Sequence, residues 1–68
     1  MTVEEMDKVK LGETVEVRIY SLKTEQYEWI PVEVEILYAK IDGHHVLMGK
    51  IEGRMEVLNN ELTRRINK

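Results

Sequence analysis

The chain has 68 residues, enough for one domain but only for a small hydrophobic core, so we expect marginal stability unless oligomerisation adds support. It contains no cysteine, which excludes disulfides and thiolate metal sites, and its apolar runs are too short for a transmembrane helix. The net charge of −3 is uneven: residues 1–35 hold nine acids and four bases, and residues 36–68 four acids and six bases, so the acidic first half argues against non-specific nucleic-acid binding.

Residues 1–8 are predicted to form an extension that precedes a domain at residues 9–68. Thr2 and Glu5 have the spacing of a helix capping box, so we expect one or two helical turns, with a disordered start as the alternative. Acidic residues occupy this stretch, where a secretion signal needs positive charge and an apolar core. We therefore expect a soluble, cytoplasmic protein with no membrane partner.

Alternation of apolar and polar residues predicts a first strand at Thr14–Tyr20, with Val15, Val17 and Ile19 facing the core. Residues 21–28 are polar and lose the alternation, so we expect a loop that is too long for a tight hairpin and could carry specificity.

The fold is expected to be built on the next stretch, Trp29–Ile41, which is the longest apolar segment. Within it, Pro31 suits a strand start or an edge strand, and the run at Ile36–Leu37 predicts a bulge or bend.

The second half of the chain has the pattern of short strands joined by tight turns. Asp42–Gly43 predicts a type I′ hairpin turn, followed by a strand at His44–Ile51. Glu52–Gly53 predicts a second two-residue turn, followed by a strand at Arg54–Leu58. We expect these strands to form antiparallel neighbours.

Residues 59–62 suit a single 3₁₀ turn, and residues 63–66 a fifth strand. This order of elements is that of an SH3-like barrel, so the predicted fold is all-β: a small five-stranded SH3-like barrel with a short N-terminal extension or helical turn. Five segments carry a resemblance to Tudor and agenet domains: Leu11–Val17, Trp29–Val34, Val46–Met48, Glu52–Gly53 and Glu61–Ile66. The chain is also similar to short phage-encoded SH3-like proteins, and the resemblance covers residues 9–66.

Three aromatic residues form the main candidate site, which we call the aromatic rim: Tyr20, Tyr27 and Trp29. Tyr20 and Trp29 are expected on the face of their strands away from the core, with Tyr27 in the loop between them. Such a group could hold a cation against its ring faces or stack a nucleotide base. The alternative is that Trp29 covers one end of the barrel with the tyrosines packed beside it. Because Tudor cages combine aromatic residues with an acidic or amide residue, the resemblance adds Tyr38 and Glu28 to the partner-binding candidates.

A second candidate group is basic. Arg54, Arg64 and Arg65 could together bind a phosphate, or they could simply be solvated charges that discourage edge-to-edge aggregation. We expect no metal site at His44–His45, because adjacent strand residues point to opposite faces and no cysteine is available. No cofactor is expected.

The sequence also lacks the residue sets of common catalytic sites. Ser21 is the only serine, and the glycines are scattered rather than gathered in a phosphate-binding loop. We therefore predict a non-catalytic SH3/Tudor-like binding module that docks a protein segment or small ligand through the aromatic rim. Two alternatives stay open. The first is a phage-type accessory protein that acts as a homo-oligomeric inhibitor or sequesters a host component. The second, disfavoured by charge, is a nucleic-acid-binding barrel.

Overall fold

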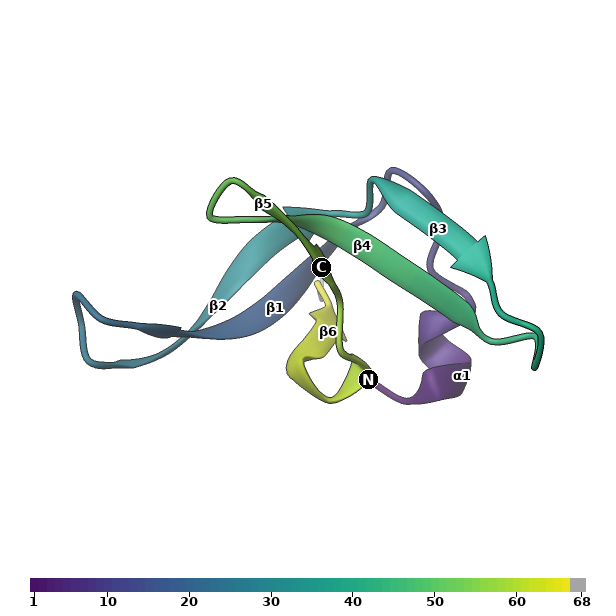
Figure 1. Cartoon of the computed structure of the whole chain (residues 1–68). Coiled ribbons are helices and arrows are strands. Elements are labelled where there is room, and N and C mark those ends of the chain that lie inside the picture. Colours follow the sequence, from purple (N-terminus) through teal and green to yellow (C-terminus); the bar gives the residue numbers. More distant parts are fainter. Residues whose placement is uncertain (67–68) are drawn as a thin grey trace.

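Six short strands form two antiparallel sheets in the computed structural model, which describes residues 1–66 (Figure 1). The strand order is β2–β1–β6 in the first sheet and β3–β4–β5 in the second. The predicted all-β class is confirmed. The predicted closed barrel of five strands is wrong, because the backbone ladders of the described residues stay within two separate sheets. In chain order the elements are α1 (Val3–Met6), β1 (Thr14–Ser21), β2 (Gln26–Glu33), β3 (Ile36–Ala39), β4 (His45–Ile51), β5 (Arg54–Val57), the 3₁₀ helix η1 (Asn60–Leu62) and β6 (Thr63–Arg65).

The β1–β2 hairpin is the longest feature of the molecule and projects away from the rest of the chain (Figure 1). Its ladder runs from the pair Thr14–Glu33 to the pair Ser21–Gln26, which leaves residues 22–25 as the turn. The prediction of a long loop over residues 21–28 is therefore wrong. Tyr20 and Tyr27 are cross-strand partners, and such aromatic pairs stabilise a ladder even where apolar alternation has stopped.

The chain passes from the first sheet to the second at Val34–Glu35. The N–H of Val34 donates to the carbonyl of Glu13 over 2.9 Å, and the next N–H, of Glu35, donates to the carbonyl of Met48 over 2.9 Å. Consecutive residues thus bond to different sheets, which breaks the stretch Trp29–Ile41 into two strands. The bend predicted at Ile36–Leu37 exists, but it lies just before these residues.

The two hairpins of the second sheet differ in their turns. The turn between β3 and β4 is closed by a 2.9 Å bond from the N–H of Gly43 to the carbonyl of Lys40, and only Gly43 in it has positive φ, at +86°. The type I′ prediction is therefore wrong, since that turn needs positive φ at both central residues. The turn between β4 and β5 matches its prediction, because Glu52 and Gly53 have φ of 52° and 80°.

The core between the sheets is small: among residues 1–66, eight apolar side chains are buried and five of them are valines. The two sheets lie close together at Gly49, where an added Cβ would lie 2.5 Å from the Glu33 carbonyl oxygen and 2.5 Å from Val32 Cγ1. Only glycine fits there without displacing β2. The buried apolar residues are Met6, Val9, Val15, Val17, Val32, Val34, Leu47 and Leu58.

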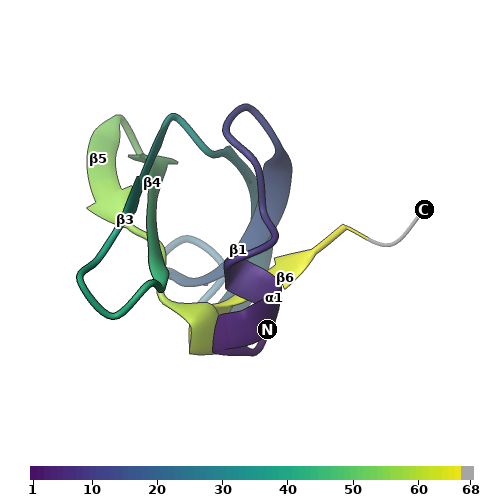
Figure 2. The same ribbon diagram turned by 90° about the vertical axis from the view of Figure 1, so that its right-hand side faces the viewer.

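The helix α1 closes one end of this core. Its predicted capping box is confirmed: the Thr2 hydroxyl accepts from the N–H of Glu5 over 3.1 Å, and the Glu5 carboxylate accepts from the N–H of Thr2 over 3.0 Å. Met6 of this segment is 4% exposed. The N-terminal amino group donates to the carbonyl of Thr63 over 3.0 Å, which places the start of the chain beside η1 and β6 (Figure 2). The 3₁₀ turn predicted for residues 59–62 is confirmed by η1.

Candidate functional site

The aromatic rim lies on the outer face of the first sheet. The register pairs Arg18 with Trp29 and Tyr20 with Tyr27, and these positions alternate with the core valines Val15 and Val17. Tyr27 is therefore a strand residue, not a loop residue as predicted. Trp29 is 36% exposed, Tyr20 50% and Tyr27 61%, so all three rings are accessible from solvent. Trp29 does not seal an end of the core.

Two arginines stack on these rings. The guanidinium carbon of Arg18 lies 4.1 Å from the ring centroid of Tyr27, and that of Arg64 lies 3.9 Å from the ring centroid of Trp29. The Tyr20 and Tyr27 rings meet edge to face, with centroids 5.3 Å apart and an interplanar angle of 73°. Two guanidinium groups and three rings thus lie together on one face of the first sheet, in a set that we call the arginine–aromatic row: Arg64, Trp29, Arg18, Tyr27 and Tyr20.

The last strand supplies one end of this row. β6 pairs with β1 so that Arg64 lies opposite Glu16, and the Arg64 Nε donates to Glu16 Oε1 over 3.0 Å. From that position the Arg64 guanidinium reaches diagonally across β1 to Trp29 on β2. Glu16 neutralises Arg64, whereas no carboxylate of residues 1–66 lies within ion-pair distance of Arg18. Arg18 is therefore a cation of the row that can still receive an anion.

Sequence reasoning missed the role of Arg18. The expectation of a cation-binding cage assumed that the ring faces were free, but Trp29 and Tyr27 each already have a guanidinium against one face. The available signal was the spacing of Arg18 and Tyr20 on one strand face, opposite aromatic residues on the next strand. The contact with Arg64 had no local signal, since it depends on how β6 docks.

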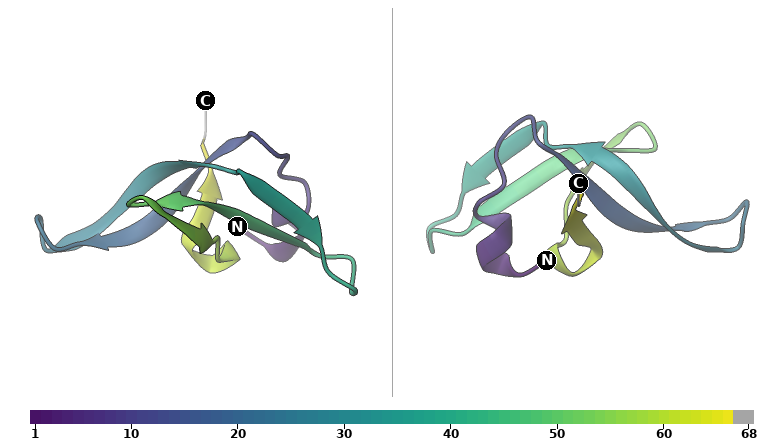
Figure 3. Two further views of the ribbon diagram at one scale, coloured as in Figure 1. Left: turned by 45° about the horizontal axis from the view of Figure 1, so that its top comes forward. Right: turned by 180° about the vertical axis from the view of Figure 1, so that it is seen from behind.

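Two of the partner-binding candidates lie elsewhere. Tyr38 is in β3, where it pairs with Val46 in the second sheet. Glu28 is opposite Ile19 in the ladder, on the other face of β2 from Trp29, and its carboxylate accepts from the Thr24 hydroxyl over 3.2 Å. The tip of the β1–β2 hairpin and the β3–β4 turn lie at opposite ends of the molecule in both views of Figure 3. The structure therefore brings together Tyr20, Tyr27 and Trp29, without Tyr38 or Glu28.

The three arginines proposed for phosphate binding do not converge. The Arg65 Nε lies 3.2 Å from Glu13 Oε2, and its Nη2 donates to the carbonyl of Lys8 over 3.1 Å. Arg54 begins β5 in the second sheet and lines an open groove of about 620 Å³ together with Ile51 of that sheet and Arg18 of the first. Arg64 faces Trp29 instead, so the group does not form one phosphate site.

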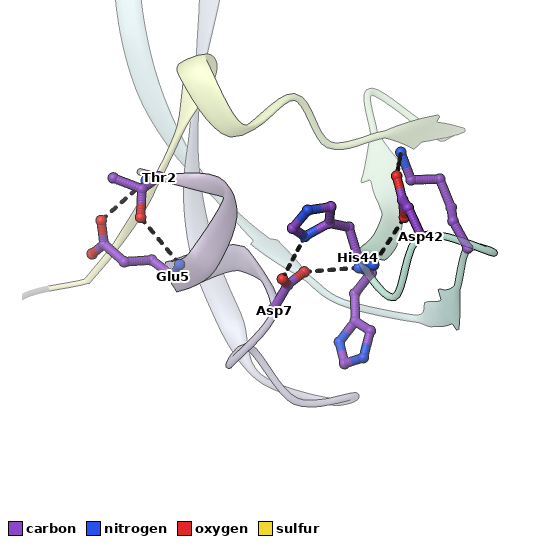
Figure 4. Close-up of polar contacts among 7 residues, drawn as sticks. Thr2, Glu5, Asp7, Asp42 and His44 are labelled. Atoms are coloured by element: carbon purple, nitrogen blue, oxygen red, sulfur yellow. Dashed lines mark hydrogen bonds and ion pairs between the residues drawn. The ribbon is translucent and has the colours of Figure 1, made fainter.

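A polar cluster joins α1 to the start of β4 (Figure 4). Asp7 Oδ2 lies 2.8 Å from His44 Nδ1, and Asp7 Oδ1 accepts from the N–H of His45 over 2.8 Å. The bond from His45, followed by that from His44, lowers the pKa of Asp7, and the Asp7 carboxylate in turn raises the pKa of His44. Asp42 Oδ1 accepts from the N–H of His44 over 3.0 Å. These contacts fix the helix on the sheet and so have a structural role.

Metal binding has no support in this cluster or in any other part of the described chain: no group of three or more His, Asp or Glu residues within 1–66 could hold an ion. No helix in the same residues is long and apolar enough to cross a membrane. The fold and the row define a small all-β protein with an exposed arginine–aromatic sheet face. In comparisons with known proteins, no family model, curated protein or solved structure matches the chain.

Proposed function

We propose that the protein is a small, non-catalytic binding module of the cytoplasm that docks a protein segment or small ligand on the arginine–aromatic row. The observation that carries this proposal is the packing of two guanidinium groups against exposed aromatic rings on one face of the first sheet. Tryptophan, tyrosine and arginine are the residue types that contribute most to binding energy at protein interfaces.

The rigidity of the row favours binding as well. Each of its side chains is attached to a paired strand position, and each contacts a neighbour in the row, so little conformational freedom remains to be lost when a partner docks. A sheet face of this kind accepts an extended segment laid across its side chains. The proposal therefore requires no pocket and no large rearrangement of the chain.

The charges of the row favour an anionic partner. A methylated lysine would compete with Arg18 and Arg64 for the faces of Tyr27 and Trp29, and would meet like charge beside each ring. A carboxylate, in contrast, would find the guanidinium of Arg18, which forms no ion pair with residues 1–66, and could bind it through two hydrogen bonds. We therefore favour a peptide segment that combines acidic and aromatic residues.

Membership of the SH3-like class is part of the proposal. It is supported by the element order, in which η1 comes between the last hairpin of the second sheet and the final strand. It is also supported by β2 and β3, which follow each other with only Val34 and Glu35 between them and can be compared with one bent strand serving both sheets. Fold class by itself does not specify a ligand, so the proposal for binding depends on the row.

The test uses the fluorescence of Trp29, the only tryptophan, which reports directly from the row. We expect a peptide rich in glutamate and tyrosine to change this fluorescence saturably, and a trimethyllysine peptide to give no saturable change. Arg18→Gln should weaken the acidic peptide about tenfold, as expected for loss of a hot-spot arginine. Arg65→Gln, which removes an arginine that pairs with Glu13 outside the row, is the matched control and should leave affinity unchanged. If the acidic peptide binds both variants equally well, or does not bind at all, the proposal fails.

A further inference from the structure

The outer face of the second sheet is unusually apolar for a surface. Its side chains come from positions of β4 that alternate with the core residue Leu47 and from their neighbours in β3 and β5. The neighbouring sets are Tyr38 with Val46, Ile36 with Met48 and Val57, and Lys50 with Met55. Lys50 is the only charged residue at these strand positions. We call the remaining set the outer apolar face: Ile36, Tyr38, Val46, Met48, Met55 and Val57.

Much of this face is open to solvent. Val57 is 60% exposed, Tyr38 50%, Ile36 40% and Met55 37%, while Val46 and Met48 are half-buried. With roughly 200 Å² for each fully exposed side chain of this size, the four most open ones offer about 400 Å² of accessible surface. A stable interface buries about 600–800 Å² on each partner, of which a little over half is apolar. The outer apolar face is therefore large enough to form the apolar centre of a small dimer interface.

We propose that this face binds a second copy of the chain, so that two second sheets pack face to face in a symmetric homodimer. The proposal is independent of ligand docking on the arginine–aromatic row, which lies on the other sheet. Antiparallel sheets commonly pack in this way, about 10 Å apart, with their inner side chains interdigitated.

The small core supports a second copy as the partner. A core of eight apolar side chains, five of them valines, leaves this chain little burial of its own, and a dimer adds a second apolar layer. An apolar face that is exposed in every folded copy needs a partner present wherever the chain is made, and only the chain itself meets that condition without further components.

The position of Lys50 selects the symmetry. Consider a two-fold axis that lies between the two sheets, perpendicular to the strands, and passes beside Met48. It would place Lys50 of one copy over Val46 and Tyr38 of the other. That arrangement separates the two ammonium groups and brings each toward an aromatic ring, where a cation is favoured. An axis along the strands would bring both lysines together, which costs free energy because like charges repel. The charges thus favour antiparallel β4 strands in the dimer.

The first test is the mass in solution, measured by sedimentation equilibrium over a range of concentrations. We expect the wild-type chain to dimerise reversibly, and Val57→Glu and Tyr38→Glu each to weaken the dimer at least about tenfold. Tyr27→Glu is the matched control: it places the same charge at a residue 61% exposed on the other sheet and should leave the dimer intact. Circular dichroism of each variant at monomeric dilution shows whether it has kept its strands.

The second test locates the interface without disrupting it. The chain has no cysteine, so single cysteine variants can be cross-linked specifically with a short bismaleimide. Met48→Cys lies near the proposed axis and should give covalent dimers, and a mixture of Val46→Cys with Lys50→Cys should do the same. Leu22→Cys, at the hairpin tip, should not. A chain that stays monomeric at all concentrations overturns the proposal, and so does a dimer that survives both glutamate substitutions or that Met48→Cys cannot cross-link.

Discussion

Arg64 stacks on Trp29, with the guanidinium carbon 3.9 Å from the ring centroid, although the two residues belong to the last and the second strand of the chain. β1 lies between those strands, and its Glu16 holds the Arg64 Nε at 3.0 Å. The Arg64 side chain therefore both holds β6 against β1 and completes the arginine–aromatic row. The stability of the final strand and the geometry of the proposed binding face should change together.

Removing this arginine gives the first prediction. Arg64→Ala should expose one face of Trp29 to water, shift its fluorescence emission to longer wavelength, and lower the free energy of unfolding by about 0.5–1 kcal/mol, because both the stacking contact and an exposed ion pair are lost. Urea unfolding followed by circular dichroism measures the second effect. Arg65→Ala is the control, since it removes an arginine with its own carboxylate partner, Glu13, while leaving Trp29 covered. Equal emission shifts in the two variants would contradict the stacking contact.

The close approach of the two sheets gives the second prediction. Gly49→Ala should destabilise the protein by about 1–3 kcal/mol, because the new methyl group would overlap the Glu33 carbonyl and Val32, and the backbone of β2 would have to move. Gly53→Asn is the control at a glycine whose φ of +80° asparagine tolerates and where an added Cβ meets nothing within 4 Å. Its stability should change by less than about 0.5 kcal/mol. If Gly49→Ala left the free energy of unfolding unchanged, the sheets would not meet at this point.

The pair Asp7–His44 gives the third prediction, a dependence of stability on pH. The pKa of Asp7 is lowered from its ordinary value of 3.8, so the Asp7 carboxylate stabilises the folded protein at pH values above 3.8. This stability is lost as the pH falls through the lowered pKa. The pKa of His44 is raised from its ordinary value of 6.5, so the protonated imidazole stabilises the folded protein at pH values below 6.5. This stability is lost as the pH rises through the raised pKa. Both contributions are present together between about pH 4 and 6.5. Neighbouring Asp42 adds to the second effect and Lys40 opposes it.

Thermal unfolding of the wild type and of His44→Gln, followed from pH 3 to pH 9, measures this dependence. The wild type should exceed the variant in melting temperature most clearly near pH 5, and the gap should narrow by pH 8. Asp7→Ala should give the same profile with a larger loss, because it also removes the acceptor for the N–H of His45. A constant gap across the whole range would show that the pair contributes nothing through its charge.

Local patterns predicted a good part of this fold. The capping box of Thr2, the two-residue turn at Glu52–Gly53 and the 3₁₀ turn each depend on residues within a few positions of one another, and each was identified correctly. The core-facing residues of β1 were also identified, because period-2 alternation fixes which side chains share a face. Pro31 lies in β2, an edge strand, as its missing N–H predicts.

The wrong predictions share a different physical cause. Tyr27 joins β2 because of its partner on β1, and the chain breaks at Val34–Glu35 because two different sheets compete for its backbone bonds. Neither effect is visible in a local window. The same holds for the site: the aromatic rim was found from composition and alternation, but its occupation by Arg18 and Arg64 depends on cross-strand geometry and on the docking of β6.

The central claim is that partners dock on the arginine–aromatic row, and the most direct measurement is a map of backbone amide chemical shifts during titration with the glutamate- and tyrosine-rich peptide. The predicted result is a saturable set of shifts centred on Arg18, Tyr27 and Trp29, with the amides of β3 unchanged. A map without saturable shifts, or one whose shifts lie in the second sheet, would contradict the claim.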